Sequence, residues 1–216
     1  LPQCLVDVPD ALILRDMDKP SDYGRLCQLA RCTGFLRPGE ARELLRIKQV
    51  SAKGIRHGEA VGAVAALFAH ALAKARRQKG QPANLFPWLA RSGGLLHDLA
   101  KGCPRHEEAA GRMLCAMQLP CMARLVKDHW DLTIKDAQPI TERELVYLAD
   151  KYCYGPSFVS LDQRFAQKLE SAANDQDAKA IMRRRQNAKN LETRLEAEIG
   201  LKPENLASKA LALGSG

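Results

Sequence analysis

At 216 residues and 46% hydrophobic composition, the chain is long enough for one sizeable domain plus an extension, which argues against disorder throughout. No apolar run approaches the ~20 residues that span a bilayer, and the N-terminus lacks the residue order of a signal peptide, so we expect a cytoplasmic protein with no membrane partner. The net charge of +8 suits an anionic partner, but the densest basic run, Arg183-Arg184-Arg185, has no interleaved aromatic residues and disfavours a nucleic acid.

In chain order, the hydrophobic pattern predicts an all-α fold after one short strand-like stretch at residues 12–14. The expected helices are separated by Gly and Pro residues and cover residues 39–50, 52–79, 85–101, 105–118, 120–130, 141–153, 157–173 and 175–199. Thr141 and Glu144 form a capping box that starts the sixth of these helices. The eighth is polar and Arg-rich, and residues 202–216 are expected to form a short helix or to be partly disordered. We therefore expect a helical bundle with a short non-helical N-terminal extension and a C-terminal polar helix.

His97 and Asp98 lie side by side at the end of an apolar stretch, in the run Leu95-Leu96-His97-Asp98-Leu99-Ala100-Lys101. Burying an imidazole beside a carboxylate costs several kcal/mol unless partners satisfy both groups, and a divalent cation does this at once. One adjacent pair is a weak signal by itself, so the remaining ligands must come from elsewhere in the chain.

The helical period tests the other histidines, because residues three, four, seven and eight apart share one face of a helix. His57 lies on the apolar stripe of the second expected helix and points inward, whereas His70 falls on its polar side and is excluded. His106 and His129 also lie on apolar stripes, and Asp150 is in line with apolar residues one turn away. Each residue alone fits an ordinary core position with hydrogen bonds inside the protein. A shared metal site satisfies all of them together.

The order of these residues along the chain resembles the HD superfamily of metal-dependent phosphohydrolases: His57, then His97-Asp98, then Asp150, each on a different expected helix. The resemblance runs from about residue 52 to 170. The His97-Asp98 run and its Lys101 are similar to the family's His-Asp segment, and the run Tyr147-Leu148-Ala149-Asp150-Lys151 is similar to its final Ala-Asp motif. The resemblance implies an all-helical HD domain.

His106 and His129 match two additional histidines of members of that superfamily with a dinuclear centre, including bacterial hydrolases of diadenosine tetraphosphate. The resemblance implies a first metal ion held by His57, His97, Asp98 and Asp150, and a second held by His106 and His129, with Asp98 as the bridge. Histidine and carboxylate ligands suit iron, manganese, nickel, cobalt or zinc, and magnesium is a further option. The number of divalent ions, one or two, and their identity stay open.

The implied chemistry is attack of a metal-activated hydroxide on phosphorus, which hydrolyses a phosphomonoester or phosphodiester of a small nucleotide-like substrate. Asp98 is placed to bridge the ions and to orient the nucleophile. Lys101, one turn on from His97, can reach a substrate phosphate as a point charge. Arg105 and Arg164 are further candidates for the same contact.

Two other functions compete with this one. The chain could be a regulatory HD module that binds metal and nucleotide for an attached transferase without turnover of its own. It could also be a structural helical interaction domain whose inward histidines are satisfied core residues. The presence of every ligand type favours catalysis over both, and the sequence predicts no oligomeric state.

A second resemblance lies near the start of the chain, where residues 11–23 look like the closing segment of nucleotidyltransferases that act on molybdopterin cofactors. That segment ends in a short strand and an Asp-x-Asp-x-Pro-x-Asp-Tyr stretch; an ordinary acidic turn is the alternative for Asp16 and Asp18. The Gly-rich nucleotide loop of such a domain does not occur in this chain. We therefore expect residues 1–36 to be a transferase remnant and linker without transferase activity, 37–200 an HD domain, and 201–216 a tail.

Overall fold

The computed structural model describes residues 34–127, 129, 131–132 and 138–213, and this part of the chain is almost entirely helical. Its helices are α2 (Pro38–Ile47), α3 (Ala52–Gln78), α4 (Pro87–Leu96), α5 (His106–Ala116), α6 (Pro120–Val126), α7 (Glu142–Lys151), α8 (Leu161–Glu170), α9 (Asp175–Ile199) and α10 (Pro203–Leu213). One small antiparallel sheet pairs β1 (Cys153–Tyr154) with β2 (Ser157–Phe158). The predicted all-α fold is confirmed.

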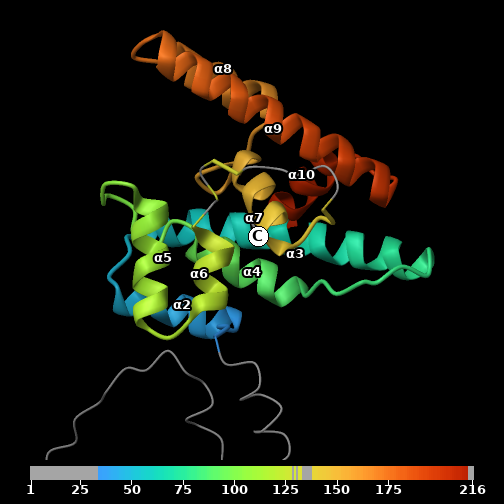
Figure 1. Ribbon diagram of the computed structural model, residues 1–216, viewed down its shortest axis with the longest axis horizontal. Helices are drawn as coiled ribbons and strands as arrows, with labels where there is room; N and C mark the ends of the chain where they lie inside the picture. Colours follow the sequence, from blue (N-terminus) through green and yellow to red (C-terminus); the bar gives the residue numbers. More distant parts are fainter. Residues whose placement is uncertain (1–33, 128, 130, 133–137, 214–216) are drawn as a thin grey trace, which may run out of the picture.

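Helix α3 runs through the middle of the molecule, with α2, α5 and α6 on one side and α8, α9 and α10 on the other (Figure 1). Val61, Val64, Phe68 and Leu72 repeat at helical spacing along it and are fully buried. By length and composition α3 is the one described helix that could cross a membrane. More than half of its most apolar stretch is buried inside the protein, which is consistent with the core helix of a soluble protein.

Two hydrophobic clusters form the core. One draws mainly on α3, α7, α9 and α10, and the other on α2, α4, α5 and α6. Helix α10, Pro203–Leu213, lies within the stretch that the sequence analysis set apart as a tail, and its Ala207 and Leu211 are buried in the first cluster. Because burial of apolar side chains is the main stabilising contribution to such a fold, α10 contributes to the core that supports α3.

Glycines set a close approach between α3 and α4. A Cβ atom added to Gly94 of α4 would lie 2.5 Å from the Cα of Gly62 in α3, and one added to Gly58 would lie 2.8 Å from the carbonyl oxygen of Leu95. The two backbones come this close because both helices carry glycine at the crossing, Gly58 and Gly62 in α3 and Gly94 in α4. This contact brings the start of α3, with His57, against the end of α4.

Two helices end four or more residues earlier than the hydrophobic pattern predicts, and a histidine of the predicted site follows each end. Helix α4 stops at Leu96 instead of residue 101, and α6 stops at Val126 instead of residue 130. Beyond each end an imidazole Nδ1 lies 2.7 Å from a helix carbonyl oxygen, that of His97 from Gly94 and that of His129 from Val126. These carbonyls would accept backbone N–H groups if the helices continued, so the histidines compete with helix propagation.

The short hairpin of β1 and β2 was not predicted, because strands of two residues are too short to show an alternating pattern. Strand β1 begins at the last residue of the sixth expected helix, and β2 occupies the start of the seventh, which instead begins at Leu161 as α8. Gly155, at the turn between the strands, has φ +58°, a left-handed conformation that favours glycine. The strand-like stretch at residues 12–14 and the transferase resemblance at residues 11–23 lie outside the described residues.

Candidate metal centre

The six residues that the sequence analysis assigned to metal binding gather where the ends of five helices meet. His57 lies near the start of α3, His97 and Asp98 directly follow α4, His106 is the first residue of α5, His129 follows α6, and Asp150 lies near the end of α7. The ring centroid of His97 is 5.0 Å from those of both His57 and His129, and the rings of His106 and His129 are 5.2 Å apart. His70, which helical phase excluded, is exposed on α3.

Backbone carbonyl oxygens orient three of the four imidazoles. The Nδ1 atom of His57 is 3.0 Å from the carbonyl oxygen of Gly155, and the Nδ1 atoms of His97 and His129 make the 2.7 Å contacts described above. A carbonyl oxygen can only accept, so each Nδ1 must donate. In the neutral rings the lone pair is therefore on Nε2, which is the arrangement that a metal-binding histidine needs.

The two carboxylate oxygens of Asp98 face two different pairs of histidines. Oδ2 lies 3.8 Å from Nε2 of His57 and 3.6 Å from Nε2 of His97. Oδ1 lies 3.4 Å from Nε2 of His106 and 3.6 Å from Nε2 of His129. One carboxylate thus stands between two groups of potential ligands, with one oxygen toward each.

Asp150 completes the first of these groups. Its Oδ1 is 3.4 Å from Nε2 of His57 and 3.7 Å from Nε2 of His97. Its Oδ2 accepts a 2.7 Å hydrogen bond from Lys151 Nζ, which also donates to the carbonyl oxygen of His129 at 3.0 Å. Lys151 is only 1% exposed, so this ammonium is fixed inside the protein and leaves one oxygen of Asp150 for the imidazoles.

The separations between these atoms fit ligands of a cation better than hydrogen-bonded partners. They range from 3.4 to 3.8 Å, beyond the usual hydrogen-bond length of about 2.7 to 3.2 Å. Two ligand atoms that are each about 2.1 Å from a tetrahedral metal ion are about 3.4 Å apart. In addition, Nε2 of His97 is buried and has no hydrogen-bond partner among the described residues. The groups His57/His97/Asp98 and Asp98/His106/His129 could each hold a metal ion.

The surroundings lower the pKa of four of the six residues and raise that of His57. Burial lowers the pKa of His97 to about 4, and burial together with the nearby His129 also lowers the pKa of His106. Burial acts to raise the pKa of both Asp98 and Asp150, but nearby cationic and imidazole groups outweigh it and hold both pKa values well below the usual range. For His57 the Asp150 carboxylate outweighs burial and raises the pKa.

The three residues proposed to contact substrate phosphate are placed differently. Lys101 reaches the site, because its Nζ lies 2.5 Å from Oδ2 of Asp98 while the side chain is largely exposed. Arg164 of α8 places a guanidinium nitrogen 3.9 Å from Oδ1 of Asp150. Arg105 is not brought into the cluster: it is exposed, and its guanidinium pairs with Glu108 at 3.5 Å.

Sequence reasoning missed two lysines of this region: Lys151, and Lys168 of α8, whose charge interacts with those of Asp150 and Lys151. Lys151 follows Asp150 directly, and a lysine adjacent to a helical carboxylate is ordinarily a solvated charge, since neighbours in sequence do not share a helix face. Here α7 is buried on most sides, including the positions of Lys151 and Asp150. Asp150 and Lys151 stand between the apolar residues 145–149 and Tyr152, and this was the signal that a lysine here would be buried.

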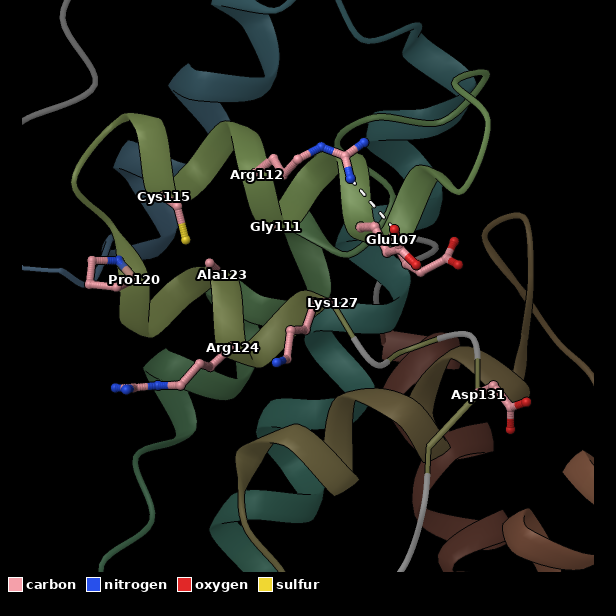
Figure 2. A pocket seen from close by; sticks show the side chains of 10 residues that line it. Glu107, Gly111, Arg112, Cys115, Pro120, Ala123, Arg124, Lys127 and Asp131 are labelled. Carbon is pink, nitrogen blue, oxygen red and sulfur yellow. Dashed lines mark ion pairs between the residues drawn. The ribbon is translucent and has the colours of Figure 1, made fainter.

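A separate groove of about 670 Å³ lies between α5 and α6 (Figure 2). Its lining contains none of the six clustered residues and mixes both signs of charge: Glu107, Glu108, Asp131, Arg112, Arg124 and Lys127. Within it Arg112 pairs with Glu108 at 3.5 Å, as the dashed line in Figure 2 marks. Glu107 links the lining of the groove to the cluster, because its carboxylate lies 3.4 Å from Nδ1 of His106.

The fold and the cluster together define a class of protein: an all-α domain whose helix ends bring imidazoles and carboxylates together as candidate ligands for divalent cations. A family model for the HD domain matches residues 54–155, slightly less than half of the chain, and this range contains all six clustered residues. The match supports the HD superfamily of metal-dependent phosphohydrolases, and the cluster is compatible with that chemistry. The family model does not reach residues 11–23, so the transferase remnant stays a prediction. No curated protein and no solved structure matched the chain.

Proposed function

We propose that this chain is a metal-dependent phosphohydrolase that cleaves a phosphomonoester or phosphodiester bond of a nucleotide-like substrate. The observation that carries the proposal is Asp98, whose two oxygens each face a pair of imidazole Nε2 atoms. In the proposed arrangement His57, His97 and Asp150 hold one divalent ion, His106 and His129 hold a second, and Asp98 bridges them. Iron, manganese, nickel, cobalt, zinc and magnesium are the candidate ions.

Bound divalent ions would supply a lowered pKa for coordinated water and neutralisation of phosphate oxygens. The protein side chains prepare the site for this chemistry. The carbonyl partners of His57, His97 and His129 fix the rings with Nε2 inward. The lowered pKa of Asp98 keeps its carboxylate ionised at neutral pH, so it can orient a nucleophilic water.

Two cations are placed to bind the phosphate that is attacked. Lys101 carries an exposed side chain whose Nζ lies beside Asp98 and can turn toward a substrate. Arg164 stands next to Asp150. Arg105 would need a different side-chain conformation to take part, because it now pairs with Glu108.

The test combines metal analysis with a substrate panel. Purified protein should contain transition metal and should release phosphate or nucleotide from at least one member of a nucleotide panel. His97→Ala and Asp98→Ala should lose metal, and His70→Ala is the matched control because His70 is exposed on α3. Wild-type metal content in the first two variants would show that the site assignment is wrong. Nucleotide binding without turnover under any candidate metal would instead favour the regulatory module.

A further inference from the structure

Helix α8 carries two cations beside the proposed metal centre. Arg164 and Lys168 are four residues apart, so they share one face of the helix. A guanidinium nitrogen of Arg164 is 3.9 Å from Oδ1 of Asp150, and Lys168 is half-buried and feels the charges of both Asp150 and Lys151. These two side chains place positive charge on α8 beside Asp150.

The guanidinium of Arg164 is only partly satisfied. Its Nε is buried and has no hydrogen-bond partner among the described residues. The 3.9 Å contact with Asp150 is too long for a hydrogen bond, and on another side the guanidinium lies 5.9 Å from the ring centroid of Tyr154. A buried guanidinium donor without an acceptor is costly, and an oxyanion is the ligand that its geometry suits best.

Positive charge predominates around Lys168. The charges that act on it most strongly are those of three cations, Lys151, Arg164 and Arg184, and one carboxylate, Asp150. That carboxylate already accepts the 2.7 Å hydrogen bond from Lys151 and faces His57 at 3.4 Å. Burial and the neighbouring cations lower the pKa of Lys168 to about 7. An anion bound here would stabilise the charged form of this lysine.

We propose that Arg164 and Lys168 form an anion subsite that binds a second phosphoryl group of the substrate, beyond the reacting one at the proposed metal centre. The substrate class that fits is therefore a compound with two or more linked phosphoryl groups, in preference to a simple phosphomonoester. The inference rests on the proposed function, because that function places the reacting phosphate at the metal centre. Arg164 borders both positions, whereas Lys168, one turn farther along α8, serves the second.

Methylenediphosphonate and methylphosphonate are suitable probes, because their P–C bonds resist hydrolysis and they differ by one phosphoryl group. Both would be titrated calorimetrically into metal-loaded and metal-free protein at fixed pH. The variants are Lys168→Met, Lys168→Arg and, as a matched control, Lys74→Met, which removes an exposed lysine from α3. Thermal melting and metal content verify that each variant is folded and loaded.

We expect the wild type to prefer the diphosphonate, and Lys168→Met to bind it about tenfold more weakly while its affinity for methylphosphonate stays within about twofold. Lys168→Arg should restore the preference, and Lys74→Met should not alter it. Equal losses for both probes, or no loss, would overturn the subsite. If the wild type fails to bind metal, the proposed function is contradicted. The subsite is still tested in that case, because the loss of diphosphonate affinity in Lys168→Met can be measured on the metal-free protein.

Discussion

Replacing Gly94 by alanine tests whether the contact of α3 with α4 builds the site. The added Cβ would lie 2.5 Å from the Cα and backbone nitrogen of Gly62 and 2.8 Å from the carbonyl carbon of Val61. Carbon atoms in van der Waals contact are about 3.5 to 4.0 Å apart, so the two helices must separate by about 1 Å. All three neighbours are backbone atoms of α3 and cannot rotate away.

The free energy of unfolding reflects two opposing effects of this substitution. Overpacking costs about 1 to 3 kcal/mol and occasionally more, while replacing a helical glycine by alanine gains up to about 1 kcal/mol. Because the clash is with the backbone of α3, which cannot rotate away, we expect a net loss of about 2 kcal/mol. Separation also moves His57 away from His97. Metal sites tolerate ligand displacements of only about 0.2 Å, so we expect metal affinity to fall by at least about tenfold.

Urea unfolding of the metal-free protein measures the stability change, and calorimetric titration with manganese measures the affinity. Gly39→Ala is the control, since Gly39 is exposed in α2 and a Cβ there meets nothing within 4 Å. That variant should be neutral or more stable by up to about 1 kcal/mol. If Gly94→Ala matches Gly39→Ala in stability and binds manganese like the wild type, the close approach does not position the site.

Three further predictions concern the charges of the cluster. Lys151→Met should destabilise the metal-free protein by about 3 to 5 kcal/mol in urea unfolding, because Asp150 loses its buried partner, and combining it with Asp150→Asn should recover much of that loss. The metal-free protein should lose up to roughly 3 kcal/mol as pH falls from about 6.5 to about 4, because unfolded His97 takes up a proton that the folded form, with its pKa near 4, does not. The lowered pKa of His106 adds to this loss and the raised pKa of His57 opposes part of it, so the slope should be smaller in His97→Gln, and a slope equal to that of the wild type would contradict the assignment. A chelator should lower the melting temperature of the wild type and leave that of Asp98→Asn unchanged; equal shifts would place the bound metal elsewhere.

Helical phase was sufficient to identify the inward-facing polar residues but not the elements that hold them. His57 was assigned correctly to the buried stripe of a long helix, because its apolar neighbours repeat over several turns. His97 and His129 were expected inside helices and instead follow them. The apolar pattern continues past the helix ends, and the side-chain hydrogen bonds that end the helices leave no trace in hydrophobic periodicity.

Contacts between segments distant in sequence were harder to predict than the elements. The carbonyl oxygen that orients His57 belongs to Gly155, 98 positions along the chain, in a hairpin too short to detect. The position of Arg164 depends on where α8 begins. This helix was expected to begin at residue 157, but the unexpected strand β2 occupies that position and α8 begins at Leu161. Spacing along one helix fixes which residues share a face, whereas these contacts depend on how the helices are arranged in the domain.

The hydrogen bonds that orient His97 and His129 also link the site to the fold. In each ring the Nδ1–H group donates a hydrogen bond to a carbonyl oxygen at a helix end, and Nε2 faces Asp98. Removing the His97 ring would leave the buried carbonyl of Gly94 without this partner, which costs about 1 to 3 kcal/mol unless the helix extends by another turn. Removing the His129 ring would leave the Val126 carbonyl with the weaker 3.3 Å hydrogen bond from the His129 backbone N–H. If either helix extended, the residues that follow it would change direction, and an extension of α4 would move Asp98. Substitutions at these two histidines should therefore alter backbone conformation as well as metal binding, whereas Asp98→Asn should alter metal binding alone.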